Sequence, residues 1–260
     1  MANPSCDIKD VYKEISTIDG YFGVEYQTGI IEHAKGPILN YCPYNNTFGY
    51  SYCSNYLHKA SSGVINLLEN LKKYNLEYDK LAEYAILLLS YKLNQHLEHK
   101  STDLNKFYTT YIEKNNHYNK KINGDNGPTY KDIINTKKDL MNIKEMSKFN
   151  GLFSILFSFY NEINKNKWNC ENHSTKAKEF IKNFEELNND SNINRNTSYS
   201  KLLSTLSDDY NNLKNKCTDF PSLPKIKTPP STLIPVLSTF PVIPVFLGVA
   251  YKVNNKELKL

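Results

Sequence analysis

The sequence contains very little arginine. Arg195 is the single arginine in 260 residues, and the net charge of +5 is spread over many lysines. Nucleic-acid binders concentrate positive charge on one face and use arginine to contact base edges and phosphates. We therefore expect no nucleic-acid partner, and only a weak attraction to acidic surfaces.

The short motifs of common enzymes are also missing. The sequence has no glycine-rich phosphate loop, no HExxH pair and no nucleophile elbow. Cys170 and His173 have the local spacing of a thiol–imidazole pair, but Cys217 is available to pair with the cysteine. Trp168, two positions earlier, is more typical of a packing anchor. We expect a protein without catalytic residues and without a cofactor.

One pair of histidines has the spacing of metal ligands. His96 and His99 stand three apart at the end of an expected helix, with Glu98 between them. Two histidines alone offer too few ligands for a stable site. We interpret the pair as part of a solvated helix end and expect no bound metal.

The C-terminal region contains a long apolar run. No charged residue occurs between positions 227 and 252, and the run from Leu233 to Tyr251 is almost entirely apolar. About 20 such residues are enough to cross the hydrocarbon core of a bilayer as a helix. Pro235, Pro241 and Pro244 each remove a backbone donor, which a membrane helix tolerates when neighbouring groups satisfy the carbonyls. We expect a single transmembrane span; the alternative is a proline-rich apolar arm that packs on the rest of the chain.

The flanking segments give the expected orientation. Residues 1–15 contain neither a basic start nor an apolar stretch, so the sequence predicts no secretory leader. Lysines at 252, 256 and 259 follow the apolar run, and positive charge beside a span favours the cytoplasmic side. We therefore expect the preceding domain to lie on the opposite face of the membrane.

Helical periodicity dominates the first 220 residues, and strand-like alternation is not evident. We expect an all-α domain of seven or eight helices, with residues 20–56 as a long irregular segment. Residues 79–97 are apolar nearly all round, so this helix should lie at the centre of the core and contact the helix at 149–163. The other expected helices cover residues 7–19, 54–74, 103–122, 129–146, 174–187 and 199–213.

These features divide the chain into four parts. We expect a helical ectodomain at residues 1–220, a stiff proline-rich spacer at 221–232, a transmembrane segment at 233–251 and a short cytoplasmic tail at 252–260.

Five cysteines suggest disulfides, with one residue left over. Cys170 precedes one expected helix and Cys217 follows the next, so an antiparallel pair of helices would return both to the same end. Cys42 and Cys53 are placed to close the irregular N-terminal segment, although Cys6 competes for either partner. In a reducing compartment all five would instead be buried thiols.

Several segments in family order resemble the PIR (Plasmodium interspersed repeat) variant antigens, in particular the rodent-malaria branch. They are Tyr41-Cys-Pro43, the run from Asp132 to Met141, Met146-Ser147 with the aromatic helix after it, the runs from Leu187 to Asn192 and from Leu202 to Asn211, Phe220-Pro-Ser-Leu-Pro224, and the apolar Leu233-Ile-Pro-Val-Leu237. Together they extend over nearly the whole chain.

The resemblance implies a non-catalytic variant antigen with a helical, disulfide-bearing ectodomain and a C-terminal span. It also implies export to the infected red cell or its surface, contact with an unknown host protein, and a role in immune evasion. The alternative is a structural or trafficking protein of the parasitophorous vacuole or host-cell membrane, with no external ligand.

Overall fold

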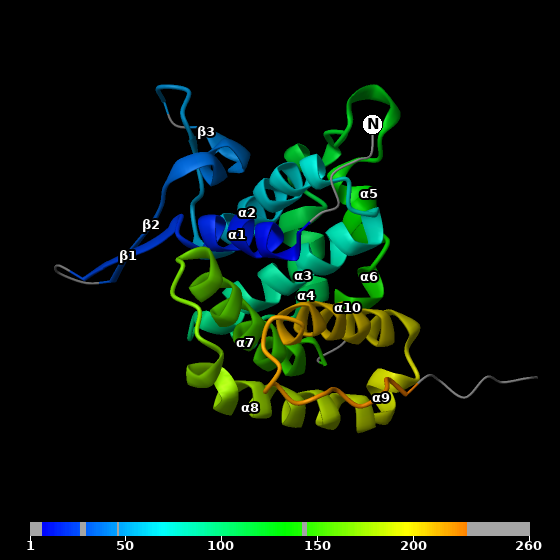
Figure 1. Cartoon of the computed structure of the whole chain (residues 1–260). Coiled ribbons are helices and arrows are strands. Elements are labelled where there is room, and N and C mark those ends of the chain that lie inside the picture. Colours follow the sequence, from blue (N-terminus) through cyan, green and yellow to red (C-terminus); the bar gives the residue numbers. More distant parts are fainter. Residues whose placement is uncertain (1–6, 27–29, 46, 142–144, 228–260) are drawn as a thin grey trace, which may run out of the picture. The chain divides into compact units, whose positions relative to one another are not determined.

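This computed structural model describes residues 7–26, 30–45, 47–141 and 145–227 of the chain. These residues belong to the first of two units into which the chain divides, Met1–Pro229. Figure 1 labels its main elements. The helices are α1 (Ile8–Asp19), α2 (Tyr56–Leu71), α3 (Tyr78–Gln95), α4 (Leu104–Phe107), α5 (Tyr130–Asn135), α6 (Lys138–Met141), α7 (Met146–Asn164), α8 (Cys170–Asn189), α9 (Ser191–Asn194) and α10 (Thr197–Lys214), and the strands are β1 (Phe22–Tyr26), β2 (Ile30–Ala34), β3 (Tyr44–Asn45) and β4 (Ser51–Tyr52).

Helix α3 is the centre of the core, as its sequence predicts. Twelve of its residues are buried, and they occupy all sides of the helix from Leu81 to Leu93. It packs against α2, α5 and α7. The Tyr91 ring meets the edges of Phe153 and Phe157 of α7, at centroid distances of 5.5 and 5.3 Å. The expected contact between these two helices is therefore confirmed.

Helices α8 and α10 form a disulfide-linked pair whose boundaries are fixed by side-chain caps. Asn169, Asp190 and Asn196 each accept backbone N–H groups at the start of α8, α9 and α10, respectively. Such caps satisfy donors that have no partner inside the helix. The polar connection at 188–196, expected as a loop, contains the short helix α9. The rings of Phe180 and Tyr210 stack between α8 and α10 at 4.6 Å.

The segment after α10 returns along α8 and α9 (Figure 1). Phe220 is buried, and Leu223 and Ile226 pack against the core. The side chain of Asn188 donates to the carbonyl of Lys225 at 2.9 Å and accepts from the backbone N–H of Lys227 at 2.8 Å. Residues 221–227, the first part of the expected proline-rich spacer, are thus bonded to the helical unit.

Two small hairpins accompany the helices of this mostly helical domain. β1 and β2 pair antiparallel with Phe22 opposite Ala34, and β3 pairs with β4. Strands β3 and β4 have two residues each and carry no period. In β1, Phe22, Val24 and Tyr26 do alternate with smaller or polar residues, but this short pattern stands in a segment rich in turn residues. The described part of the chain remains mostly helical.

Two expected helices are shorter than their sequence patterns indicated. In place of one helix over 103–122, α4 continues as a wide π turn at Tyr108–Ile112 and stops. The stretch 129–146 starts near Thr129 as expected, and the structure shows a capping box of Thr129 and Asp132 there. However, α5 ends at Asn135 and α6 begins at Lys138. The break lies at Lys137, whose side chain turns inward to two carboxylates, described below.

Within the residues that the structure describes, no helix combines the length and the hydrophobicity needed to cross a bilayer. The expected span at 233–251 lies outside those residues, as does the tail at 252–260.

Candidate interaction site: an aromatic hairpin closed by a disulfide

The hairpin of β3 and β4 is closed at its base by a disulfide between Cys42 and Cys53. Their Cα atoms are 4.8 Å apart, and the bond closes a separation of 11 residues. Inside it, Tyr44 pairs with Tyr52 in the strand register. An isolated two-stranded hairpin is marginally stable in water, so the disulfide accounts for its persistence. We call residues 42–53 the closed hairpin.

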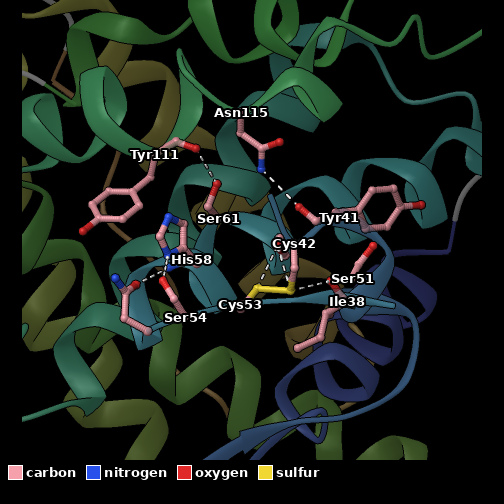
Figure 2. The surroundings of a disulfide bond; sticks show 12 residues. Ile38, Tyr41, Cys42, Ser51, Cys53, Ser54, His58, Ser61, Tyr111 and Asn115 are labelled. Carbon is pink, nitrogen blue, oxygen red and sulfur yellow. Dashed lines mark hydrogen bonds between the residues drawn. A yellow bond between two sulfur atoms is a disulfide. The ribbon is translucent and has the colours of Figure 1, made fainter. Parts of the chain in front are cut away.

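The base of the closed hairpin is fixed to the helical unit. Figure 2 shows the disulfide and the residues around it. The side chain of Asn115 donates to the carbonyl of Tyr41 at 3.1 Å, directly before the disulfide. The Ser62 hydroxyl of α2 lies 3.4 Å from the sulfur of Cys53. Ile38, four residues before the disulfide, is fully buried. The hairpin thus extends from a rigid, buried base.

The outer part of the closed hairpin carries exposed aromatic side chains. The exposed fractions are 43% for Tyr44, 82% for Phe48, 72% for Tyr50 and 44% for Tyr52. Among the side chains whose exposure is described, which leaves out those of residues 24–34, only two other large hydrophobic ones are exposed, Tyr78 and Leu97. Scattered exposed apolar residues are ordinary on a protein surface, whereas a cluster of them marks an interaction site.

A glycine makes the tip of this hairpin possible. Gly49 has a φ of 80°, and a Cβ placed there would meet nothing within 4 Å. The left-handed backbone, not lack of space, therefore favours glycine at this position. The turn holds Phe48 and Tyr50 on either side of it, both directed into solvent.

A histidine from α2 supports the aromatic pair in the strands. The His58 ring meets Tyr44 edge to face at 5.1 Å and Tyr111 at 5.0 Å. Its Nδ1 is 2.9 Å from the Ser54 hydroxyl, a contact drawn in Figure 2. Burial lowers the pKa of His58, so the ring is neutral at physiological pH. A neutral ring suits a contact with aromatic faces.

The closed hairpin has the composition of a recognition loop. No Asp, Glu, Lys or Arg occurs from residue 36 to residue 58, and the hairpin is made of Tyr, Asn, Phe, Thr, Ser and Gly with Pro43. Antibody binding loops are rich in Tyr, Ser, Gly and Asn because these residues give large contact areas and adaptable hydrogen bonds at low entropic cost. Chemically, this surface offers aromatic faces with hydroxyl and amide groups, and no carboxylate or cationic side chain.

The second candidate pair of cysteines is also joined. Cys170 and Cys217 form a disulfide with Cα atoms 5.6 Å apart, at the start of α8 and just past the end of α10. The expected antiparallel arrangement accounts for this, although Cys170 is the first residue of α8 and does not precede it. Cys6, the competing cysteine, lies outside the described residues.

The same disulfide removes the thiol–imidazole pair as a nucleophile. The sulfur of Cys170 is bonded to Cys217 and offers no thiolate. His173 stacks on Trp168 at 4.7 Å, and both rings pack against Phe159. Trp168 therefore acts as the packing anchor that the sequence indicated.

The histidine pair at the end of α3 lies in a turn rather than on a helix, since α3 ends at Gln95. Three potential metal-ligand atoms, a ring nitrogen each of His96 and His99 and a carboxylate oxygen of Glu98, lie within 4.8 Å of one another. A count of the histidines alone left out the carboxylate of Glu98 as a third ligand.

The transmembrane candidates Leu233, Pro235, Pro241, Pro244 and Tyr251 all lie outside the described residues.

The fold and the closed hairpin define a disulfide-bonded helical domain that displays an exposed aromatic hairpin. The chain belongs to the Plasmodium variant antigen family Cir/Yir/Bir: the family model described as "Plasmodium variant antigen protein Cir/Yir/Bir" matches residues 12–252. That model groups the three names together and does not separate a rodent branch.

A solved structure shares the fold. The "Structure of a Plasmodium PIR protein ectodomain" matches with a TM-score of 0.60 and 32% sequence identity, over 85% of this chain and 100% of the other. No curated protein matches the chain significantly.

Proposed function

We propose that this chain is a non-catalytic variant surface antigen that contacts a host protein through the closed hairpin. Membership in the variant antigen family supports the antigen role. The observation that carries the contact is the exposure of Tyr44, Phe48, Tyr50 and Tyr52 on a single disulfide-closed segment.

The physical basis of the contact is pre-organisation. Tyr and Trp, with Arg, supply most binding hot spots, and aromatic residues are enriched at protein interfaces. A loop already held in one conformation loses less entropy on binding than a free one. The disulfide and the Asn115–Tyr41 hydrogen bond hold the base of the hairpin before any partner arrives. The lack of charge favours a neutral, pocketed protein surface over a nucleic acid.

The chain topology is part of the proposal. Residues 1–220 form the ectodomain, 221–232 the spacer, 233–251 a single membrane span and 252–260 the cytoplasmic tail. The domain is then exported to the infected red cell or its surface, or to the vacuole membrane, where antigen variation serves immune evasion. The host protein is unknown, and the aromatic, uncharged hairpin indicates only the kind of surface that it would present.

Binding of host blood cells by the full-length chain displayed on transfected cells tests the contact. The double variant Phe48→Ser/Tyr50→Ser removes the two most exposed aromatic rings. Truncation of a hot-spot residue costs about 2 kcal/mol of binding free energy or more. We therefore expect the number of adherent cells to fall at least tenfold, by about that cost. Tyr78→Ser is the matched control, since Tyr78 is also exposed but lies at the start of α3.

Equal adhesion by the hairpin variant and the control would reject the hairpin as the contact. No adhesion by any form, at normal surface display, would favour the structural or trafficking role without an external ligand.

A further inference from the structure

The end of α3 folds back on itself. His96 leaves the helix in an extended conformation, with φ −97° and ψ 117°. Its carbonyl then accepts the backbone N–H groups of His99 at 2.9 Å and of Lys100 at 3.0 Å. The N–H of Thr102 donates to the carbonyl of His99 at 2.9 Å. These consecutive turns bring ligand atoms of His96, Glu98 and His99 within 4.8 Å of one another.

One aromatic ring supports both imidazoles. Tyr56, the first residue of α2, has its centroid 4.4 Å from that of His96 and 5.5 Å from that of His99. The two imidazoles lie 4.5 Å apart. The phenol of Tyr56 donates to the carbonyl of Lys92 at 2.8 Å, which fixes the ring against the last turn of α3. Both imidazoles are thus confined by a common wall before any ligand binds.

The spacing fits a metal ion after a small inward movement. Three atoms no more than 4.8 Å apart all lie within 4.8/√3, or about 2.8 Å, of some common point. Zinc is bound by histidine nitrogen at about 2.0–2.1 Å and by carboxylate oxygen at about 2.0–2.2 Å. The required shift is about 0.7 Å per side chain. The two imidazoles are stacked with an angle of 26° between their planes, so each ring must also turn until a nitrogen lone pair points at the ion. Glu98 is exposed and both histidines are only half-buried, which leaves room for these rotations.

We propose that His96, Glu98 and His99 form a binding site for a divalent transition-metal ion, with Zn²⁺ as the reference ligand. Two imidazoles and one carboxylate are a donor set that suits Zn²⁺, Cu²⁺ or Ni²⁺. Ca²⁺ and Mg²⁺ prefer sites made of several oxygen ligands, and this site offers one carboxylate. Water completes the coordination at this open surface. The bound ion joins both imidazoles to Glu98 and closes the turn that follows α3.

Isothermal titration of the full-length, detergent-solubilised chain with ZnCl₂ tests the site. All proteins carry Cys6→Ser, so that the cysteine outside the two disulfides adds no thiol ligand. We expect one Zn²⁺ per chain. His99→Gln and Glu98→Gln should each weaken binding at least tenfold, because even loss of a second-shell partner costs about 10–100-fold. His117→Gln, which removes an imidazole elsewhere, should leave the affinity unchanged.

Failure to bind Zn²⁺ would overturn the proposal, as would an equal loss of affinity in His99→Gln and His117→Gln. Unchanged binding in Glu98→Gln would also overturn it, since the site would then be reduced to a histidine pair. Glu98 is exposed, so this variant keeps the fold, which circular dichroism checks. Saturation by CaCl₂ at equal concentration would contradict the assigned class of ion.

Discussion

The phenol of Tyr12 donates a 2.9 Å hydrogen bond to the carboxylate of Asp209, across 197 positions of sequence. Tyr84 donates to the same carboxylate at 2.9 Å, and Tyr160 donates to the backbone carbonyl of Asp209 at 2.8 Å. Helices α1, α3, α7 and α10 therefore converge on one buried acidic residue. Tyr12 and Tyr160 also stack at 4.4 Å.

The first prediction is a pH-dependent stability that Asp209 controls. Burial raises the pKa of Asp209 to about 7, while hydrogen bonds from Tyr12 and Tyr84 act in the opposite direction. The folded state then binds more protons than the unfolded state between about pH 4 and pH 7, so the free energy of unfolding falls as pH rises through that range. The slope is at most about 1.4 kcal/mol per pH unit.

Asp209→Asn should remove this slope. Urea unfolding of both proteins at pH 5 and pH 7 should show the wild type losing about 2 kcal/mol relative to the variant. Burial lowers the pKa of His58, His117 and His173, which gives a contribution of opposite sign. Those histidines are present in both proteins, so the difference isolates Asp209. Parallel pH profiles would contradict the prediction.

The second prediction concerns the core. Leu88 is 1% exposed at the centre of α3, and Leu88→Ala should lower the free energy of unfolding by about 2–5 kcal/mol through lost burial and a cavity. Leu97→Ala is the matched control, because Leu97 is 82% exposed and should change stability by no more than about 0.5 kcal/mol. Urea titration measures both, and similar values for the two variants would contradict the packing of α3.

The third prediction separates the two disulfides. Cys170 and Cys217 close 47 residues, whereas Cys42 and Cys53 close 11. In the chain-entropy model the longer loop contributes about 4 kcal/mol and the shorter about 3 kcal/mol. We expect the Cys170→Ser/Cys217→Ser double variant to melt at the lower temperature. The reverse order would mean that the closed hairpin stabilises the whole domain more than the α8–α10 pair does.

The fourth prediction concerns a buried ion pair. Nζ of Lys137 is 2.9 Å from Glu83 and 3.0 Å from Asp79, and Lys137 and Glu83 are both nearly fully buried. Lys137→Met leaves the Glu83 charge uncompensated, so unfolding free energy should fall by about 3–5 kcal/mol. Lys201→Met is the control, since Lys201 pairs with Asp79 at the surface and should cost at most about 1 kcal/mol.

A partial rescue checks the cause of that loss. Adding Glu83→Gln to Lys137→Met removes the stranded charge and should recover part of the stability lost in the single variant. Additive losses in the double variant, measured by urea titration, would show that Lys137 stabilises the fold by packing rather than by charge.

The long helices and their contacts followed from sequence because large apolar stripes need a partner. Helix α3 is apolar on all sides and α7 carries a wide apolar stripe, so the two helices could bury these surfaces most simply against each other. The burial of Asp209 also had a signal: it stands three residues after Leu206 and four before Leu213, on the apolar face of α10. Because Ser207 and Asp208 precede it directly, Asp209 looked like part of a polar, solvent-exposed stretch.

The cysteine positions predicted the closure between Cys42 and Cys53, but the strand pairing inside the closed hairpin and the turn after α3 were beyond such reasoning. Strands of two residues carry no period, and the paired tyrosines become visible only when the disulfide sets the register. The grouping of His96, Glu98 and His99 depends on where α3 stops, and helix ends are set by local hydrogen bonds rather than by apolar spacing. Neither local geometry follows from a pattern of hydrophobic residues.

The most direct test of the surface role is protease treatment of intact infected red cells. If the helical domain faces the host, trypsin added outside the intact cells should remove peptides of this domain. A parasite protein located inside the cell is the control and should stay undigested. Mass spectrometry of peptides from residues 7–227 measures the loss. Protection of the domain until the cell membrane is permeabilised would contradict a surface antigen and place the domain inside the infected cell.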